Sequence, residues 1–156
     1  MTDRWDHHFL DMALHCAAMS KDPNTRVGAV LVGPDNEVRG TGYNGFPRGI
    51  ADTSARLNDR DLKLRLMVHA ERNAILNCAR AGIQTKGCTL YLAATDHTGA
   101  VWGGCPCTAC SLEIIQAGIA TVVAHPFKAV PSSWRDDIAF ASVVLAEAGV
   151  AYREVT

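Results

Sequence analysis

The strongest constraint on this chain comes from two short motifs that lie far apart in the sequence. One is His69-Ala70-Glu71, and the other is Pro106-Cys107-Thr108-Ala109-Cys110. Histidine nitrogen and cysteine thiolate are ligands that zinc prefers, and three protein ligands in a tetrahedral site leave a fourth position for water. We therefore expect the fold to bring His69, Cys107 and Cys110 together around one catalytic Zn²⁺ per chain. Glu71 is left beside the metal as a free carboxylate, which suits a proton shuttle.

The spacing within each motif predicts that both stand at helix starts. Cys107 and Cys110 are three residues apart and share one face of a helix. Pro106 suits the first helical position, where its missing N–H has no cost. His69 and Glu71 are two apart, so they converge only if His69 is still entering the helix that follows.

Two other kinds of site use similar motifs. A lone Cys-x-x-Cys also occurs in redox pairs and as half of a structural zinc site. The chain has six cysteines but no second Cys-x-x-Cys, and a redox pair leaves the His69-x-Glu71 motif unexplained. A structural zinc site does not need the carboxylate of Glu71. The complete set of residues therefore favours a catalytic metal site.

The composition is that of an ordinary globular protein. The 156 residues are 48% hydrophobic and 20% charged, with a formal net charge of −1. We expect one domain over residues 1–156. The charge argues against a nucleic-acid partner. The chain opens without an apolar signal core, and no apolar run approaches the length of a membrane span. We expect a cytoplasmic protein with no membrane contact.

Hydrophobic periodicity and turn residues predict an alternation of helices and strands. Strands are expected at 27–32, 37–41, 88–94, 120–124 and 150–155, and helices at 6–19, 72–80, 107–118 and 134–148. The first two strands form a hairpin across the turn at 33–36. This order predicts a three-layer α/β/α sandwich around a five-stranded mixed sheet.

Two segments are harder to interpret. Residues 42–49 hold three glycines, a proline and two aromatics in eight residues, which favours a shaped loop near a ligand over an ordinary tight turn. Residues 52–67 are polar and charged. Asn58 or Asp59 could cap a helix there, but the alternating leucines 62, 64 and 66 would equally suit an extended piece.

These motifs resemble the cytidine deaminase superfamily and, within it, the deoxycytidylate (dCMP) deaminases. The His-x-Glu and Pro-Cys-x-x-Cys motifs specify the superfamily, as in the zinc base deaminases generally. Residues 20–23 (Ser-Lys-Asp-Pro), 27–30 (Val-Gly-Ala-Val) and the loop at 42–49 narrow the resemblance to the dCMP deaminases. The likeness covers nearly the whole chain.

The resemblance implies a cytidine deaminase-like fold and conversion of dCMP to dUMP with release of ammonia. It places Asn44 on the deoxyribose 3′-hydroxyl and the Ala70 backbone on the polar edge of the base. It also implies a homo-oligomer, most often a hexamer, with dCTP and dTTP as effectors and Mg²⁺ accompanying a nucleotide effector. Residues 95–105 depart from the family by inserting a Gly- and Trp-containing loop directly before the metal motif.

A nucleotide substrate needs cationic donors for its 5′-phosphate. The candidates are Lys21, Thr25 and Arg26 after the first helix and Arg48 in the 43–49 loop, with the two arginines favoured because their planar forks bond two phosphate oxygens. Solvated surface charges are the ordinary alternative. Other functions also stay open at this point: deamination of a free or modified base, a nucleoside or a tRNA adenosine, or a non-catalytic zinc-stabilised protein.

Overall fold

The computed structural model describes residues 3–128 and 132–156. Residues 126–131, which a proline at each end marks as a loop, lie partly outside the described residues. The helices are α1 (Asp3–Ala17), α2 (Ser54–Asn58), α3 (Arg60–Leu66), α4 (Ala70–Ala81), α5 (Thr108–Gln116) and α6 (Ser132–Glu147). The strands are β1 (Thr25–Val32), β2 (Val38–Tyr43), β3 (Thr89–Asp96), β4 (Val101–Gly103), β5 (Thr121–Ala124) and β6 (Ala151–Glu154).

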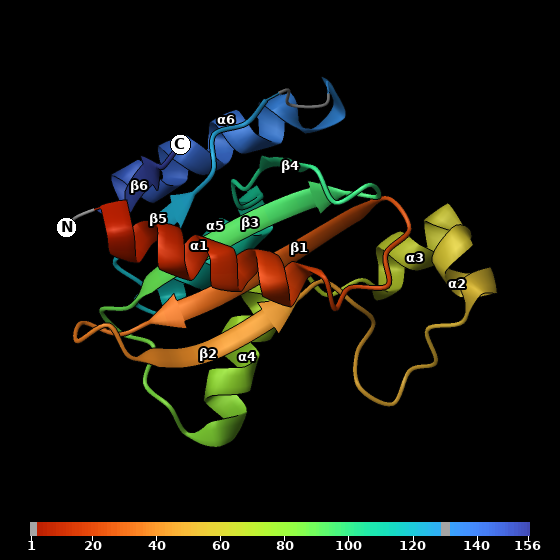
Figure 1. Ribbon diagram of the computed structural model, residues 1–156, viewed down its shortest axis with the longest axis horizontal. Coiled ribbons are helices and arrows are strands. Elements are labelled where there is room, and N and C mark those ends of the chain that lie inside the picture. Colours follow the sequence, from red (N-terminus) through yellow and green to blue (C-terminus); the bar gives the residue numbers. More distant parts are fainter. Residues whose placement is uncertain (1–2, 129–131) are drawn as a thin grey trace.

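The sheet has the order β2-β1-β3-β5-β6 (Figure 1). The β1–β2 and β1–β3 pairs are antiparallel, whereas β3–β5 and β5–β6 are parallel. The five predicted strands and the mixed sheet are therefore confirmed. A sixth strand, β4, pairs antiparallel with the end of β3 at Ala94 and Thr95. It lies inside the inserted segment 95–105, so the prediction of a loop over this whole segment is wrong at Val101–Gly103.

Two hydrophobic cores cover the two faces of the sheet, as expected for three layers. On one face, α1 places Phe9, Leu10 and Ala13 against Val30 and Tyr91. On the other face, α4, α5 and the inner side of α6 enclose a second core. Because side chains alternate along a strand, β1 contributes Val30 and Val32 to the α1 face and Ala29 and Leu31 to the other.

Residues 52–67, left undecided by their sequence, form two short helices that lie apart from the sheet (Figure 1). Asp59 separates them and caps the second, because its side chain accepts a hydrogen bond from the backbone N–H of Leu62 at 3.0 Å. The helical alternative is therefore correct. None of the helices among the described residues is both long and apolar enough to cross a bilayer.

Candidate metal centre and active site

The first half of the site is the start of α4. His69 is the N-cap residue, with an extended backbone (φ −69°, ψ 155°) and no capping hydrogen bond from its side chain. Glu71 lies in the first turn and is 4% exposed. Since His69 stands just outside the helix, its ring is free to converge with the Glu71 side chain, as the two-residue spacing predicted.

The second half is the start of α5. Cys107 is the N-cap residue (φ −69°, ψ 167°), and Cys110 lies in the first turn and is buried. Pro106 was expected at the first helical position, and that detail is wrong. The backbone of Cys107 is still extended, so the helix begins at Thr108 and Pro106 precedes the cap. Both thiols nevertheless stand at the positive end of the helix dipole.

The two helix starts meet and form a three-residue cluster that could hold a metal ion. His69 Nδ1 lies 3.5 Å from Cys107 Sγ and 3.4 Å from Cys110 Sγ. Ligands of one tetrahedral zinc, with bonds of about 2.3 Å to sulfur and 2.0–2.1 Å to nitrogen, stand about 3.5 Å apart. The spacing and the donor set therefore both fit Zn²⁺.

The electrostatics of the cluster shift the pKa of Cys107 downward and that of Glu71 upward. Hydrogen bonds from Cys110 and His69 lower the pKa of the Cys107 thiol. Burial raises the pKa of the Glu71 carboxyl above its usual range. A buried carboxyl whose proton affinity is raised by its surroundings is chemically suited to taking up and returning a proton.

Two polar links hold the motif helices in place. Arg72 of α4 binds Glu113 of α5, with Arg72 Nε at 2.8 and 2.9 Å from the two carboxylate oxygens. The backbone N–H of Thr108 donates to Asp137 of α6 at 2.9 Å. The first link ties the two metal-ligand helices together, and the second anchors the α5 start to the last helix.

A cavity of about 500 Å³ opens over the cluster and is lined by His69, Glu71 and Cys107. That volume lies within the range of small-molecule sites. Trp102 of β4 and Phe127 line it as well, and their ring centroids are 5.3 Å apart. The inserted segment 95–105 therefore lies beside the metal cluster.

Three of the predicted substrate contacts, Asn44, Thr25 and Ala70, line this cavity. Asn44 is buried, and its side-chain amide is engaged with β1: Oδ1 accepts from the backbone N–H of Val27 at 2.8 Å, and Nδ2 donates to the carbonyl of Thr25 at 2.9 Å. Asn44 therefore fixes the 43–49 loop to the edge of the cavity. Its contact with a sugar hydroxyl stays a prediction.

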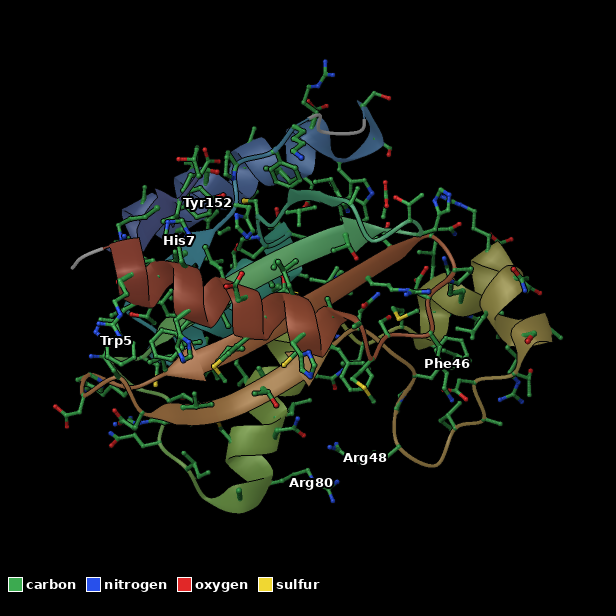
Figure 2. The ribbon with its side chains drawn as sticks, in the orientation of Figure 1. Trp5, His7, Phe46, Arg48, Arg80 and Tyr152 are labelled. Atoms are coloured by element: carbon green, nitrogen blue, oxygen red, sulfur yellow. The ribbon has the colours of Figure 1, made fainter. Side chains whose placement is uncertain are left out.

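The cavity of this chain does not include the three basic residues proposed for phosphate binding. Lys21 is exposed and pairs with Asp52 at 2.9 Å. Arg48 donates to Asn77 of α4 at 2.8 Å, and Figure 2 shows it directed toward that helix. Arg26 lies one residue from the cavity-lining Thr25 and Val27, so strand alternation turns it toward the α1 face. The phosphate roles of these three residues stay predictions, and Arg26 keeps a buried Nε with no hydrogen-bond partner in the described part of the chain.

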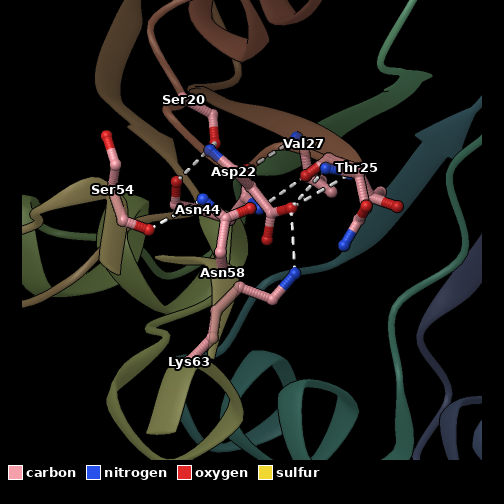
Figure 3. Close-up of polar contacts among 9 residues, drawn as sticks. Ser20, Asp22, Thr25, Val27, Asn44, Ser54, Asn58 and Lys63 are labelled. Atoms are coloured by element: carbon pink, nitrogen blue, oxygen red, sulfur yellow. Dashed lines mark hydrogen bonds and ion pairs between the residues drawn. The ribbon is translucent and has the colours of Figure 1, made fainter. Parts of the chain in front are cut away.

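Two residues that line the cavity, Lys63 and Asp22, are absent from the predicted site, and they form a buried ion pair (Figure 3). Lys63 lies in the segment 52–67, whose structure the sequence left undecided. No local signal marks it, because its partner Asp22 is 41 positions away in the sequence.

An α/β/α fold that joins a histidine to a Cys-x-x-Cys pair at two helix starts, beside a buried glutamate, defines a zinc deaminase. Comparison with known proteins narrows this class. Residues 3–126 match the family described as cytidine and deoxycytidylate deaminase zinc-binding region. The chain belongs to this family.

Individual proteins similar to this chain are also deaminases. The chain is 36% identical to human deoxycytidylate deaminase over 155 residues, covering 96% of this chain and 79% of the relative. It is 34% identical to an uncharacterized deaminase from Aliivibrio fischeri, covering 96% and 92%. Its fold matches the structure of a cyanophage S-TIM5 dCMP deaminase in complex with dCMP and dUMP, with a TM-score of 0.76, 22% identity and 99% of both chains covered.

Proposed function

We propose that this protein catalyses the zinc-dependent hydrolytic deamination of dCMP to dUMP, with release of ammonia. The observation that carries the proposal is the buried Glu71, which lines the same cavity as the three-ligand cluster and is not one of its ligands. Relatives at about one-third identity over nearly the whole chain are deoxycytidylate deaminases, which supports dCMP as the substrate.

His69, Cys107 and Cys110 would hold the zinc ion. When bound, zinc lowers the pKa of a water molecule so that it can act as a nucleophile at neutral pH. Glu71 accepts the first proton as water adds to C4 of cytosine and delivers it to N3. Glu71 then takes the remaining hydroxyl proton to the exocyclic amine, which leaves as ammonia. Asn44 and the Ala70 backbone orient the sugar and the base edge.

The test is ammonia release by the zinc-loaded protein across cytosine, cytidine, deoxycytidine, CMP, dCMP and dCTP. We expect dCMP to give the highest kcat/KM. Glu71→Gln should retain zinc and the folded state but lose activity by about 10²-fold or more. Near-normal turnover by this variant would remove the proton-shuttle role, and a clear preference for another compound would remove the dCMP assignment.

We also propose a cytoplasmic homo-oligomer, with a hexamer favoured, regulated by dCTP and dTTP together with Mg²⁺. Large apolar side chains on the outer surfaces of three helices support subunit contacts: Leu76 of α4 is 48% exposed, Leu112 of α5 is 52% exposed and Phe140 of α6 is 58% exposed. Light scattering measures the assembly, and the dCMP concentration at half-maximal rate should fall with dCTP. A monomer whose rate is indifferent to both nucleotides contradicts this proposal.

A further inference from the structure

Lys63 is a buried cation at the edge of the substrate cavity. Its side chain is 9% exposed, and its Nζ lies 3.2 Å from Asp22 Oδ1, whose side chain is 7% exposed. In Figure 3 the Lys63 side chain extends from α3 to the loop before β1, where this carboxylate lies. Lysine is rarely buried to this degree unless its charge has a use or a partner.

Asp22 alone does not satisfy Lys63. A lysine ammonium has three N–H donors, and among the described residues Lys63 has one hydrogen bond, to Asp22. Burying a cation with unused donors is costly. The remaining N–H donors of Lys63 belong to a residue that lines the same cavity as Glu71. The arrangement therefore suits an anionic or strongly accepting group on a bound ligand.

Asp22 holds the loop before β1 and the Lys63 side chain in place. The same Oδ1 atom accepts hydrogen bonds from the backbone N–H groups of Asn24 at 2.8 Å and Thr25 at 3.2 Å. One carboxylate oxygen thus holds the loop and the ammonium in a fixed relation. The polar side chains of Asn24 and Thr25 line the cavity next to Lys63 and could add hydrogen bonds to the same ligand group.

The positions of the charged residues indicate which part of the cavity could bind an anionic group of the ligand. Among the described residues that line the main cavity, Lys63 is the one lysine or arginine. A smaller cavity of about 240 Å³ adjoins it, with Lys63 and Asn24 lining both and Arg60 lining the second. Two cations, Lys63 and Arg60, therefore stand near the shared side of the two cavities beside the carboxylate of Asp22, whereas His69, Cys107 and Glu71 line the main cavity only.

We propose that Lys63 binds the 5′-phosphate of the nucleotide, with Asp22 as the residue that positions it. The inference rests on the proposed function and assigns the contact that distinguishes dCMP from deoxycytidine. It replaces Lys21, Arg26 and Arg48 with a residue on α3. A charge-assisted hydrogen bond to phosphate corresponds to about a 10- to 100-fold difference in kcat/KM.

The experiment compares kcat/KM on dCMP and deoxycytidine for Asp22→Asn, Lys63→Met and the double variant. Lys63→Met alone leaves a buried carboxylate without its partner and could unfold the chain, so the charge-balanced double variant carries the test. We expect it to lower the dCMP-to-deoxycytidine ratio about 10- to 100-fold. Asp22→Asn retains the cation and should keep a preference for dCMP. Lys63→Arg keeps a cation at this position and should keep much of the wild-type dCMP-to-deoxycytidine ratio.

Lys21→Met is the matched control, because it removes the same charge from an exposed lysine and should leave the ratio unchanged. Calorimetric binding of dUMP and deoxyuridine supplies a readout that needs no turnover. If the double variant keeps the wild-type ratio and the wild-type difference in binding, Lys63 serves only as the partner of Asp22 and the inference is wrong. If wild type releases no ammonia from any cytosine compound, the proposed function fails, while the binding difference still tests Lys63.

Discussion

Asp137 of α6 accepts a hydrogen bond from the backbone N–H of Thr108, at 2.9 Å, at the start of the metal-binding helix α5. The N-cap residue of α5 is Cys107, whose side chain makes no capping bond. A helix start normally has a side-chain acceptor from its own N-cap. Here the thiol is committed to the metal cluster, so the acceptor comes from another helix.

We therefore expect Asp137→Ala to weaken both the fold and metal retention. Loss of an N-terminal acceptor costs about 1–2 kcal/mol of unfolding free energy, and a displaced α5 start moves Cys107 relative to His69. Chemical denaturation and zinc competition with a chelator measure the two effects. Asp136→Ala, at the exposed neighbouring position, is the control. Zinc retention equal to wild type in Asp137→Ala would show that the cluster does not depend on this contact.

A second prediction separates the metal ligands from the other cysteine in the cavity. Cys105 lines the cavity with Cys107, but the three-residue cluster contains Cys107 and not Cys105. The wild type and Cys105→Ala should each bind about one zinc per chain, whereas Cys107→Ala should lose it. Metal analysis after gel filtration gives the stoichiometry. Loss of zinc from Cys105→Ala, or its retention by Cys107→Ala, would contradict the ligand assignment.

A third prediction concerns acid stability. Asp6 is fully buried and accepts hydrogen bonds from Tyr91 Oη at 2.8 Å and from Arg153 at 2.8 and 3.0 Å. Burial alone would raise the pKa of Asp6, but the hydrogen bonds from Arg153 and Tyr91 outweigh it and lower the pKa. Charged Asp6 therefore stabilises the fold at pH values above the ordinary carboxyl pKa of about 3.9.

That stabilisation is lost as the pH falls below about 4 and through the lowered pKa of Asp6. Asp6→Asn should unfold more easily at neutral pH and show a shallower loss of stability on the acid side. Thermal unfolding from pH 7 to pH 3 measures the slope. Asp11→Asn, exposed on the same helix, is the control. An acid slope unchanged in Asp6→Asn would rule out this linkage.

Much of the fold followed from sequence because its signals are local. The hairpin of β1 and β2 and the helix start at His69 were both predicted. The five main strands were found to within a few residues. The metal ligands were predictable because zinc restricts both the residue types and their spacing.

The features that sequence could not supply depend on contacts between distant segments. Nothing in the segment 52–67 shows that Lys63 meets Asp22, because that pair forms only after α3 packs against the loop before β1. The short strand β4 exists because the inserted segment turns back onto the end of β3. The helix predicted at 6–19 does not show that Asp6 is buried, because its partner Arg153 lies near the other end of the chain.

A last prediction tests how α4 is held against the sheet. A Cβ at Gly42 of β2 would collide with the Ala70 carbonyl oxygen and the Ala74 backbone nitrogen of α4. These are backbone atoms in the first turns of the helix that carries Glu71, so they can yield only if the whole helix start moves. Gly42→Ala should therefore reduce stability by about 1–3 kcal/mol or more and lower zinc retention.

Gly45→Ala is the matched control for this substitution. A Cβ at Gly45 would meet only the Tyr43 ring, at an ordinary contact distance of 3.6 Å. Denaturant unfolding and metal content are measured for both variants. We expect Gly45→Ala to behave much as wild type, whereas Gly42→Ala should lose stability and zinc together, because the same movement of α4 displaces His69. A Gly42→Ala protein with wild-type stability and full zinc would show that α4 can be shifted without disturbing the cluster.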